Sequence, residues 1–270
     1  MVTTQGLREQ AGSEPITMLT AYDAPTARVI DEAGIDVILV GDSMGNAVLG
    51  YESTLPVTIE EVKNRTAAVA RATENALVVA DMPFLSFGVD EAETIHNAGG
   101  MLKEAGADAV KIESGHHTVE LTERLTQLGI PVMAHLGLTP QSVNQLGGYG
   151  RQGTTVDAAR TLLATARDHQ EAGAFSLVLE HIPANVAAQV TAELSIPTIG
   201  IGAGADCDGQ VLVITDVFGL ADRSPPFSAQ FGDVKAEMET AVDRYREAVE
   251  TGEFPADEHS RSDPELDELY

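Results

Sequence analysis

The sequence lacks the features of secreted, disulfide-linked or membrane-spanning chains. Cys207 is the only cysteine among 270 residues, so no disulfide can form within the chain, which agrees with a reducing cytoplasm. No apolar run approaches the roughly 20 residues that a membrane helix needs. The N-terminal sequence MVTTQGLREQAGSEP has no basic start followed by an apolar stretch, so no signal peptide is visible. We therefore expect a cytoplasmic protein with no membrane partner.

Positive charge is scarce. Only 16 lysines and arginines oppose 42 acids, which gives a net charge of −26. The lysines number four: Lys63, Lys103, Lys111 and Lys235. Such a surface repels nucleic acid and anionic membranes. An acid-rich, lysine-poor surface suits concentrated salt, where screening suppresses self-repulsion. The composition therefore favours a halophilic protein, and an acidic protein of an ordinary cytoplasm is the alternative.

Short apolar runs alternate with helical patterns along most of the chain. Eight runs are typical of strands, and they cover residues 15–20, 36–42, 76–81, 107–113, 130–135, 175–180, 196–202 and 211–216. Strands that are apolar on both faces belong to parallel sheets covered by helices. The pattern predicts an α/β fold, a single-domain (β/α)₈ TIM barrel over residues 1–250. An open doubly wound sheet is the alternative, disfavoured because no early G-x-G-x-x-G turn is present.

Segments between and after these runs carry their own signals. Thr58 and Glu61 form a capping-box pattern that predicts a helix from there to about Asn75. The tripeptide EAG occurs three times, where glycine can end a helix. Residues 138–155 are predicted to be a long loop of the kind that covers a site. Residues 228–250 predict an amphipathic helix, and residues 251–270 an acidic, flexible tail.

Ionisable side chains end many of the predicted strands. They are Asp42, Asp81, Glu113, His135 and Glu180. Lys111 lies two residues before Glu113, so alternation along a strand places both on one face. Because active sites of (β/α)₈ barrels lie at the carboxyl ends of the strands, these side chains are candidate site residues.

Several acids converging on one place would repel each other and lose hydration. A divalent cation such as Mg²⁺ removes much of that cost, and oxygen ligands are the ones it prefers. The alternative is that each acid caps a following helix or pairs with an arginine. The small residues of GIGAG, 200–204, indicate either close approach to a ligand or tight packing of strand on helix.

Nine motifs carry a resemblance to a known family. They are TAYDAPTA (20–27), LVGDSMG (39–45), STLPVT (53–58), ADMPF (80–84), VKIES (110–114), HLGLTPQSVNQLGGY (135–149), LVLE (177–180), IPTIGIGAG (196–204) and DGQVLV (208–213). Together, and in this order, the motifs resemble the ketopantoate hydroxymethyltransferase family. The resemblance runs from about residue 17 to about residue 255, which is almost the whole chain.

The resemblance implies a (β/α)₈ barrel that assembles as a homo-oligomer, commonly a homodecamer. It implies transfer of a hydroxymethyl group from 5,10-methylenetetrahydrofolate, or a related pterin, to 3-methyl-2-oxobutanoate. The product, 2-dehydropantoate, feeds pantothenate and coenzyme A synthesis. By motif, Asp42, Asp81 and Glu113 correspond to the ligands of a Mg²⁺ ion in each subunit. Asp42, Ser43, Asp81 and Lys111 correspond to contacts of the oxoacid, with His135 in the same pocket, and Glu180 corresponds to the proton acceptor.

Two other functions remain open at the level of sequence. One is a Mg²⁺-dependent carbon–carbon lyase or phosphonate mutase acting on 2-oxoacids, although many such lyases use a loop cysteine and Cys207 follows GIGAG instead. The other is a barrel that binds a metabolite without catalysis. The chain also departs from the family pattern at His181 and at Gly150–Arg151.

Overall fold

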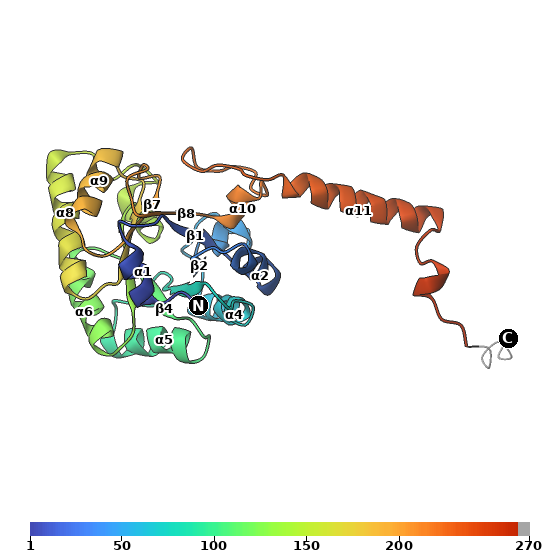
Figure 1. Ribbon diagram of the computed structural model, residues 1–270, viewed down its shortest axis with the longest axis horizontal. Helices are drawn as coiled ribbons and strands as arrows, with labels where there is room; N and C mark the ends of the chain where they lie inside the picture. The colour runs from blue at the N-terminus through green and yellow to red at the C-terminus, as the bar shows by residue number, and fades with distance from the viewer. Residues whose placement is uncertain (264–270) are drawn as a thin grey trace. The chain divides into compact units, whose positions relative to one another are not determined.

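A closed barrel of parallel strands forms the centre of the protein. The computed structural model describes residues 1–263 (Figure 1). The strands are β1 (Ile16–Thr20), β2 (Val37–Val40), β3 (Leu77–Asp81), β4 (Ala109–Glu113), β5 (Val132–Gly137), β6 (Ser176–Glu180), β7 (Thr198–Ile201) and β8 (Gly209–Leu212). They pair in sequence order, and β8 closes on β1. The predicted (β/α)₈ fold is therefore confirmed, and the doubly wound alternative is wrong.

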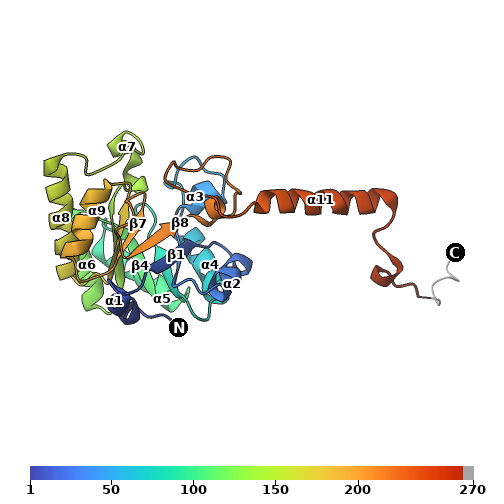
Figure 2. The same ribbon diagram turned by 45° about the horizontal axis from the view of Figure 1, so that its top comes forward.

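Helices make up much of the rest of the chain that the structure describes. They are α1 (Thr4–Gln10), α2 (Ala24–Glu32), α3 (Met44–Ala47), α4 (Ile59–Ala70), α5 (Glu91–Lys103), α6 (Val119–Gln127), α7 (Val143–Leu146), α8 (Val156–Glu171), α9 (Ala184–Glu193), α10 (Ile214–Val217) and α11 (Val234–Thr251). Short 3₁₀ turns cover His116–Thr118, Pro140–Ser142 and Asp257–His259. Figure 2 shows α1 at one end of the barrel, and α3 and α7 at the other. The second end is where the strands finish.

The helix signals in the sequence are confirmed, with one boundary corrected. α4 begins with the predicted capping box, in which Thr58 and Glu61 bond each other's backbone N–H groups. It ends at Ala70 rather than near Asn75. The cause is the buried Asp31, whose carboxylate accepts hydrogen bonds from the N–H groups of Glu74, Asn75 and Ala76. Those N–H groups are thereby directed toward Asp31 rather than into a continued helix.

The eighth strand lies earlier than predicted. The run 211–216 was expected to be a strand, but β8 covers Gly209–Leu212 and the short helix α10 begins at Ile214. Gly209 starts the strand against β1, where a Cβ would lie 2.4 Å from the carbonyl oxygen of Ile16. Only glycine permits that approach. After β8, the Ile214 N–H donates to the Thr20 hydroxyl, which turns the chain out of the barrel.

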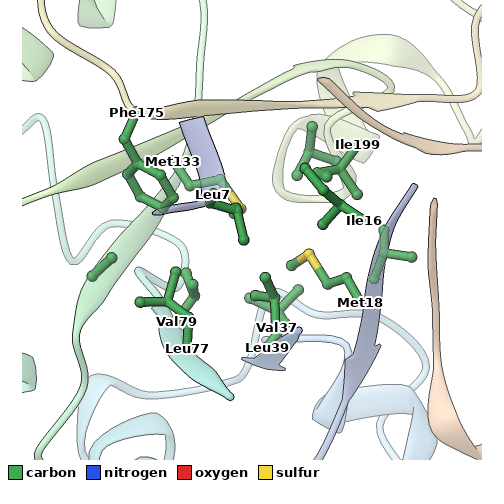
Figure 3. Packing of buried hydrophobic residues seen from close by; sticks show 13 residues of the cluster. Leu7, Ile16, Met18, Val37, Leu39, Leu77, Val79, Met133, Phe175 and Ile199 are labelled. Carbon is green, nitrogen blue, oxygen red and sulfur yellow. The ribbon is translucent and has the colours of Figure 1, made fainter. Parts of the chain in front are cut away.

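Apolar side chains from all eight strands fill the barrel interior. Figure 3 shows Leu7 of α1 among residues that include Met18, Leu77, Met133 and Ile199, all of them buried. Leu7 is fully buried, so α1 closes the end where the strands begin. Apolar side chains therefore fill the end of the barrel where the strands begin. The polar side chains lie at the opposite end, as is usual in (β/α)₈ enzymes.

The chain divides into two compact units. The first comprises residues 1–214 and 225–228 and contains the barrel. The second comprises residues 215–224 and the chain from 229 onward, and contains α11. The predicted helix at 228–250 begins six residues late, at Val234, where Asp233 caps it. Residues 264–270 of the predicted acidic tail lie outside the described residues. Within residues 1–263, no helix is long and apolar enough to cross a membrane.

Candidate active site

The side chains predicted from the strand ends lie together at one end of the barrel. Strand register places Asp81 beside Lys111, and Glu113 beside His135. Asp42 follows β2 by two residues, and Glu180 is the last residue of β6. Five of these six side chains are buried, whereas Glu180 keeps 17% of its side chain exposed. The acids, Lys111 and His135 are thus shielded from solvent, whereas solvent partly reaches Glu180.

A buried ion pair occupies the middle of the site. Lys111 Nζ lies 2.8 Å from Asp81 Oδ1. The other carboxylate oxygen of Asp81 accepts a hydrogen bond of 3.1 Å from the backbone N–H of Asp42. Asp81 is therefore fixed from both sides, and Lys111 supplies the positive charge among the acids.

Gln141 connects the two remaining acids. Its side-chain N–H groups donate to Asp42 Oδ2 at 2.8 Å and to the Met82 carbonyl at 3.0 Å. Its backbone N–H points at both carboxylate oxygens of Glu113, at 3.1 and 3.0 Å. One residue of the 138–155 loop thus holds carboxylates from two different strand ends, and this role was not predicted.

His135 links Lys111 to Glu180. Its Nδ1 lies 3.5 Å from Lys111 Nζ, and its Nε2 lies 3.1 Å from Glu180 Oε2. A lysine ammonium can only donate, so Nδ1 is the acceptor and the proton of the ring is on Nε2, directed to Glu180. The Nε2–Glu180 contact is within ion-pair distance but is not aligned as a regular hydrogen bond. His135 therefore lies between Lys111 and Glu180, within reach of both.

The Ser43 hydroxyl contacts Tyr22, a second residue that was not predicted from the sequence. Its hydroxyl lies 2.9 Å from the Tyr22 hydroxyl, and it makes no side-chain cap on the following helix α3. Tyr22 is buried. The Ser43 hydroxyl is thereby positioned beside Asp42, where a substrate oxygen could reach it.

The pKa shifts show that ionising the buried acids of the site together is costly. Burial, and then the charge of Asp81, raise the pKa of Asp42 to about 8. Burial, followed by the charge of Asp42, raises the pKa of Glu113 well above its ordinary value. Burial alone would lower the pKa of Lys111, but Asp81, Asp42 and Glu113 outweigh it and raise that pKa. With all groups ionised, three carboxylates and one ammonium leave two uncompensated negative charges.

The donor set fits a divalent cation in charge and in chemistry. Carboxylate oxygens are the ligands that Mg²⁺ prefers, and a cation would offset the excess negative charge. Within residues 1–263, however, no three acidic, histidine or cysteine side chains converge closely enough to hold an ion as they stand. The backbone N–H of Gln141 donates to Glu113, and its side-chain amide donates to Asp42. Binding would therefore require small movements of these side chains.

The predicted loop over the site is partly helical and is tied to β6. It contains the turn Pro140–Ser142 and α7. The Leu138 N–H donates to the Glu180 carbonyl at 2.8 Å, and the Gln152 N–H donates to the His181 carbonyl at 3.0 Å. Gly137 makes this possible, because its φ is +101° and a Cβ there would lie 2.2 Å from the Glu180 carbonyl oxygen. The loop is anchored at both ends beside Glu180.

Sequence reasoning identified the charged residues of the site but missed two polar ones. Gln141 and Tyr22 lie inside motifs, HLGLTPQS and TAYDAPTA, yet neither ends a strand. The available signal for Gln141 was its position six residues after the strand-end His135, in a loop rich in polar residues. Cys207 lies outside the site, and burial raises the pKa of its thiol, which disfavours the reactive thiolate.

Solved structures with the same fold are (β/α)₈ enzymes of low sequence identity. Phosphoenolpyruvate phosphomutase from Streptomyces platensis subsp. rosaceus aligns with a TM-score of 0.61 at 15% identity, covering 93% of this chain and 88% of that one. 2,3-Dimethylmalate lyase aligns with a TM-score of 0.60 at 17% identity, covering 98% and 93%. Fold and site together define a parallel-barrel enzyme with a buried acid–lysine centre. At this identity the likeness concerns the fold alone.

Sequence comparison supplies the family. The profile described as ketopantoate hydroxymethyltransferase matches residues 1–257, and the chain belongs to that family. The 3-methyl-2-oxobutanoate hydroxymethyltransferase of Haloarcula marismortui is 66% identical over all of both chains. That of Halobacterium salinarum is 68% identical over 96% of this chain and 94% of its own, and that of Geobacter metallireducens is 52% identical over 94% and 95%.

The predicted family and its hydroxymethyltransferase activity in pantothenate biosynthesis are thereby confirmed. The hydroxymethyltransferase is therefore favoured over the lyase, mutase and non-catalytic alternatives, because the mutase and lyase named above share only 15% and 17% of their sequence with this chain. Two of the similar relatives come from haloarchaea, which supports the high-salt interpretation of the acidic composition.

Proposed function

We propose that this chain transfers a hydroxymethyl group from 5,10-methylenetetrahydrofolate, or a related reduced pterin, to 3-methyl-2-oxobutanoate. The observation that carries the proposal is the continuous set of contacts from the buried acids, through Lys111 and His135, to the partly exposed carboxylate of Glu180. The acids and Lys111 suit the binding of an anionic oxoacid together with a cation. Glu180, at the other end, suits the removal of a proton.

The oxoacid would bind at Asp42, Ser43, Asp81, Lys111 and His135. The ammonium of Lys111 is buried against Asp81 and His135, and it could shift toward the substrate carboxylate or keto oxygen. The Ser43 hydroxyl and the backbone near Asp42 offer donors to the same oxygens. Lys111 would thus stabilise negative charge as it develops on the keto oxygen.

Asp42, Asp81 and Glu113 would hold Mg²⁺. A bound Mg²⁺ would act as a Lewis acid toward the oxoacid. What supports this assignment is the raised pKa of Asp42 and of Glu113, which burial and then a neighbouring carboxylate cause even though Lys111 acts in the opposite direction. Gln141 would keep these carboxylates oriented from the loop side.

Glu180 would take the proton from C3 of the oxoacid, and the His135 N–H would orient its carboxylate. The resulting enolate carbon would form a bond to the methylene carbon of the donor, and the two bonds from that carbon to N5 and N10 of the donor would break. One water molecule would supply the hydroxyl group. The proton taken by Glu180 and the remaining proton of the water would pass to the two nitrogens, so 2-dehydropantoate and the tetrahydropterin are the products. The anchored 138–155 loop would limit access of other water.

We further propose a cytoplasmic homo-oligomer, with a homodecamer as the family resemblance implies. The support lies on α11, which has no buried residue in the single chain. Met238, Val242, Tyr245 and Val249 recur at helical spacing and are between 46% and 66% exposed. An apolar stripe of this size is typical of a helix that packs against another chain.

The direct test is an assay of purified protein with 3-methyl-2-oxobutanoate and 5,10-methylenetetrahydrofolate, in molar potassium chloride with Mg²⁺. We expect 2-dehydropantoate and tetrahydrofolate in equal amounts. Tetrahydromethanopterin-type donors are assayed in parallel, because either kind of reduced pterin could carry the one-carbon unit. The absence of product with every donor would contradict the proposed reaction.

A further inference from the structure

Two hydroxyl groups meet across neighbouring strand ends at the barrel mouth. Tyr22 follows β1 by two residues, and Ser43 follows β2 by three residues, directly after Asp42. Because β1 and β2 pair side by side, the two residues come together, and their side-chain oxygens lie 2.9 Å apart. Either oxygen can be the donor of this hydrogen bond. The pair therefore connects β1 to the residue that follows a proposed ligand of the metal.

The two hydroxyl-bearing residues differ in their access to solvent. Tyr22 is only 2% exposed, whereas Ser43 is partly exposed. A molecule that enters from solvent can thus contact Ser43 more readily than Tyr22. Any influence of Tyr22 on a bound molecule is therefore expected to pass through Ser43.

The position of the Ser43 hydroxyl is restricted by its surroundings. A Cβ on Gly41 would lie 2.7 Å from Ser43 Oγ, so glycine at position 41 leaves the room that this hydroxyl occupies. The hydroxyl does not cap the following helix α3. Since a serine hydroxyl can accept one hydrogen bond and donate another, the contact with Tyr22 is compatible with a second contact to a ligand.

The backbone on both sides of Tyr22 is fixed. The Ala21 N–H donates to the Leu39 carbonyl at 3.0 Å, which extends the pairing of β1 with β2. Arg65 of α4 donates to the Tyr22 carbonyl at 3.3 Å, and Asp23 caps α2. The tyrosine hydroxyl is thus held in place by the fold before any ligand arrives. A group that is already in place loses little conformational freedom on binding.

We propose that Tyr22 is a positioning residue for the oxoacid. Its O–H donates to Ser43 Oγ and thereby directs the Ser43 O–H toward an oxygen of the bound oxoacid. This inference rests on the proposed function, in which Ser43 contacts the oxoacid. Without the tyrosine hydroxyl, the Ser43 hydroxyl would be free to rotate toward other acceptors, and the oxoacid would bind more weakly.

Binding of 3-methyl-2-oxobutanoate to the whole protein, measured by calorimetry with Mg²⁺ in molar potassium chloride, tests the proposal. Tyr22→Phe keeps the buried ring and removes only the hydroxyl. We expect it to raise the Kd for the oxoacid about three- to tenfold, the range of one hydrogen bond. Tyr51→Phe is the matched control, because its hydroxyl donates to Glu61 at 3.2 Å and not to a residue of the site. The control should leave the Kd unchanged.

A double-mutant cycle distinguishes positioning from a general structural effect. Ser43→Ala removes the hydroxyl through which Tyr22 would act. If the proposal holds, adding Tyr22→Phe to Ser43→Ala raises the Kd no further. If Tyr22→Phe raises the Kd by the same factor with and without the Ser43 hydroxyl, Tyr22 acts independently of Ser43 and the proposal is overturned.

Gly41→Ala disturbs the same contact from the other side and leaves Tyr22 unaltered. The added methyl group would displace Ser43 Oγ, so we expect the Kd for the oxoacid to rise at least as much as in Tyr22→Phe. This variant keeps the proposal testable if loss of the tyrosine hydroxyl impairs folding. An unchanged Kd in Gly41→Ala would overturn the proposal.

The Tyr22 inference and the proposed function can fail separately. If the unaltered protein neither binds the oxoacid nor exchanges deuterium at its C3, the proposed function fails. If the unaltered protein does both, and Tyr22→Phe binds the oxoacid with the same Kd as the unaltered protein, the Tyr22 inference alone is overturned.

Discussion

Lys111 Nζ and Asp81 Oδ1 lie 2.8 Å apart in a closed barrel mouth, where register places β3 and β4 residues side by side. Both side chains are almost completely shielded from solvent. Removing one partner of a buried pair leaves the other charge without compensation and costs about 3–5 kcal/mol. The pair is therefore a sensitive point for stability and, under the proposed function, for binding of the oxoacid.

Lys111→Ala is expected to raise the KM for 3-methyl-2-oxobutanoate at least tenfold and to lower the melting temperature. The reason is that the variant removes the only positive side chain in the acid cluster and leaves Asp81 unpaired. The control is Lys63→Ala, which breaks an ion pair with Glu104 at the surface and should change neither quantity by much. An unchanged oxoacid KM in Lys111→Ala would remove this residue from the site.

Gln141→Leu is expected to destabilise the metal-free protein by about 1–3 kcal/mol per unsatisfied group. Its amide is the donor to buried Asp42 and to the Met82 carbonyl, and a leucine of similar size supplies neither hydrogen bond. Urea unfolding with and without Mg²⁺ is the measurement, with Gln127→Leu on the surface of α6 as the control. If Gln141→Leu and Gln127→Leu had the same free energy of unfolding, Gln141 would not hold the acids.

The raised pKa of Asp42 predicts how Mg²⁺ stabilises the protein at different pH values. Its pKa is about 8 in the folded chain and 3.8 ordinarily, so the folded, metal-free protein binds an extra proton. The corresponding stability is fully present below about pH 4 and is lost as pH rises through 8. A cation replaces the proton, so the rise in melting temperature on adding Mg²⁺ should grow from pH 6 to pH 9.

Asp42→Asn is the control for this pH dependence, because an amide neither titrates nor attracts the cation as strongly. Its response to Mg²⁺ should be smaller and should grow less with pH, with Glu113 responsible for what remains. A response to Mg²⁺ in the unaltered protein that is constant from pH 6 to pH 9 would contradict the assignment of Asp42 as a ligand.

The acidic composition predicts dependence on salt. With 42 acids against 16 bases, self-repulsion should lower stability in dilute buffer and be screened as potassium chloride approaches molar concentration. The melting temperature should therefore rise steadily with potassium chloride. A protein that is as stable in 50 mM salt as in 2 M salt would exclude the halophilic interpretation.

Much of the fold could be predicted because each strand leaves a local signature. Parallel strands are apolar on both faces, and a charged residue ends the apolar run just where the barrel mouth begins, as at Asp81, Glu113 and Glu180. Lys111 was found for the same reason, through its spacing from Glu113. The three EAG tripeptides marked the ends of α2, α5 and α8, because glycine there has positive φ.

The features that were missed depend on contacts between distant segments. Gln141 meets Asp42 across 99 residues of sequence, and Asp31 ends α4 from 43 to 45 residues away. The start of β8 at Gly209 depends on the backbone of β1. No local pattern contains such information, so loop conformation and strand offset followed only from the three-dimensional structure.

Deuterium exchange at C3 of 3-methyl-2-oxobutanoate, without any donor, tests the central claim most directly. In deuterated buffer with Mg²⁺, the unaltered protein should exchange the C3 proton, and Glu180→Gln should lose that exchange by about 100-fold or more. Oxoacid binding, measured by calorimetry, should remain nearly intact because Glu180 contacts His135 rather than the acid–lysine pair. Exchange at the unaltered rate in Glu180→Gln would contradict the assignment of Glu180 as the base.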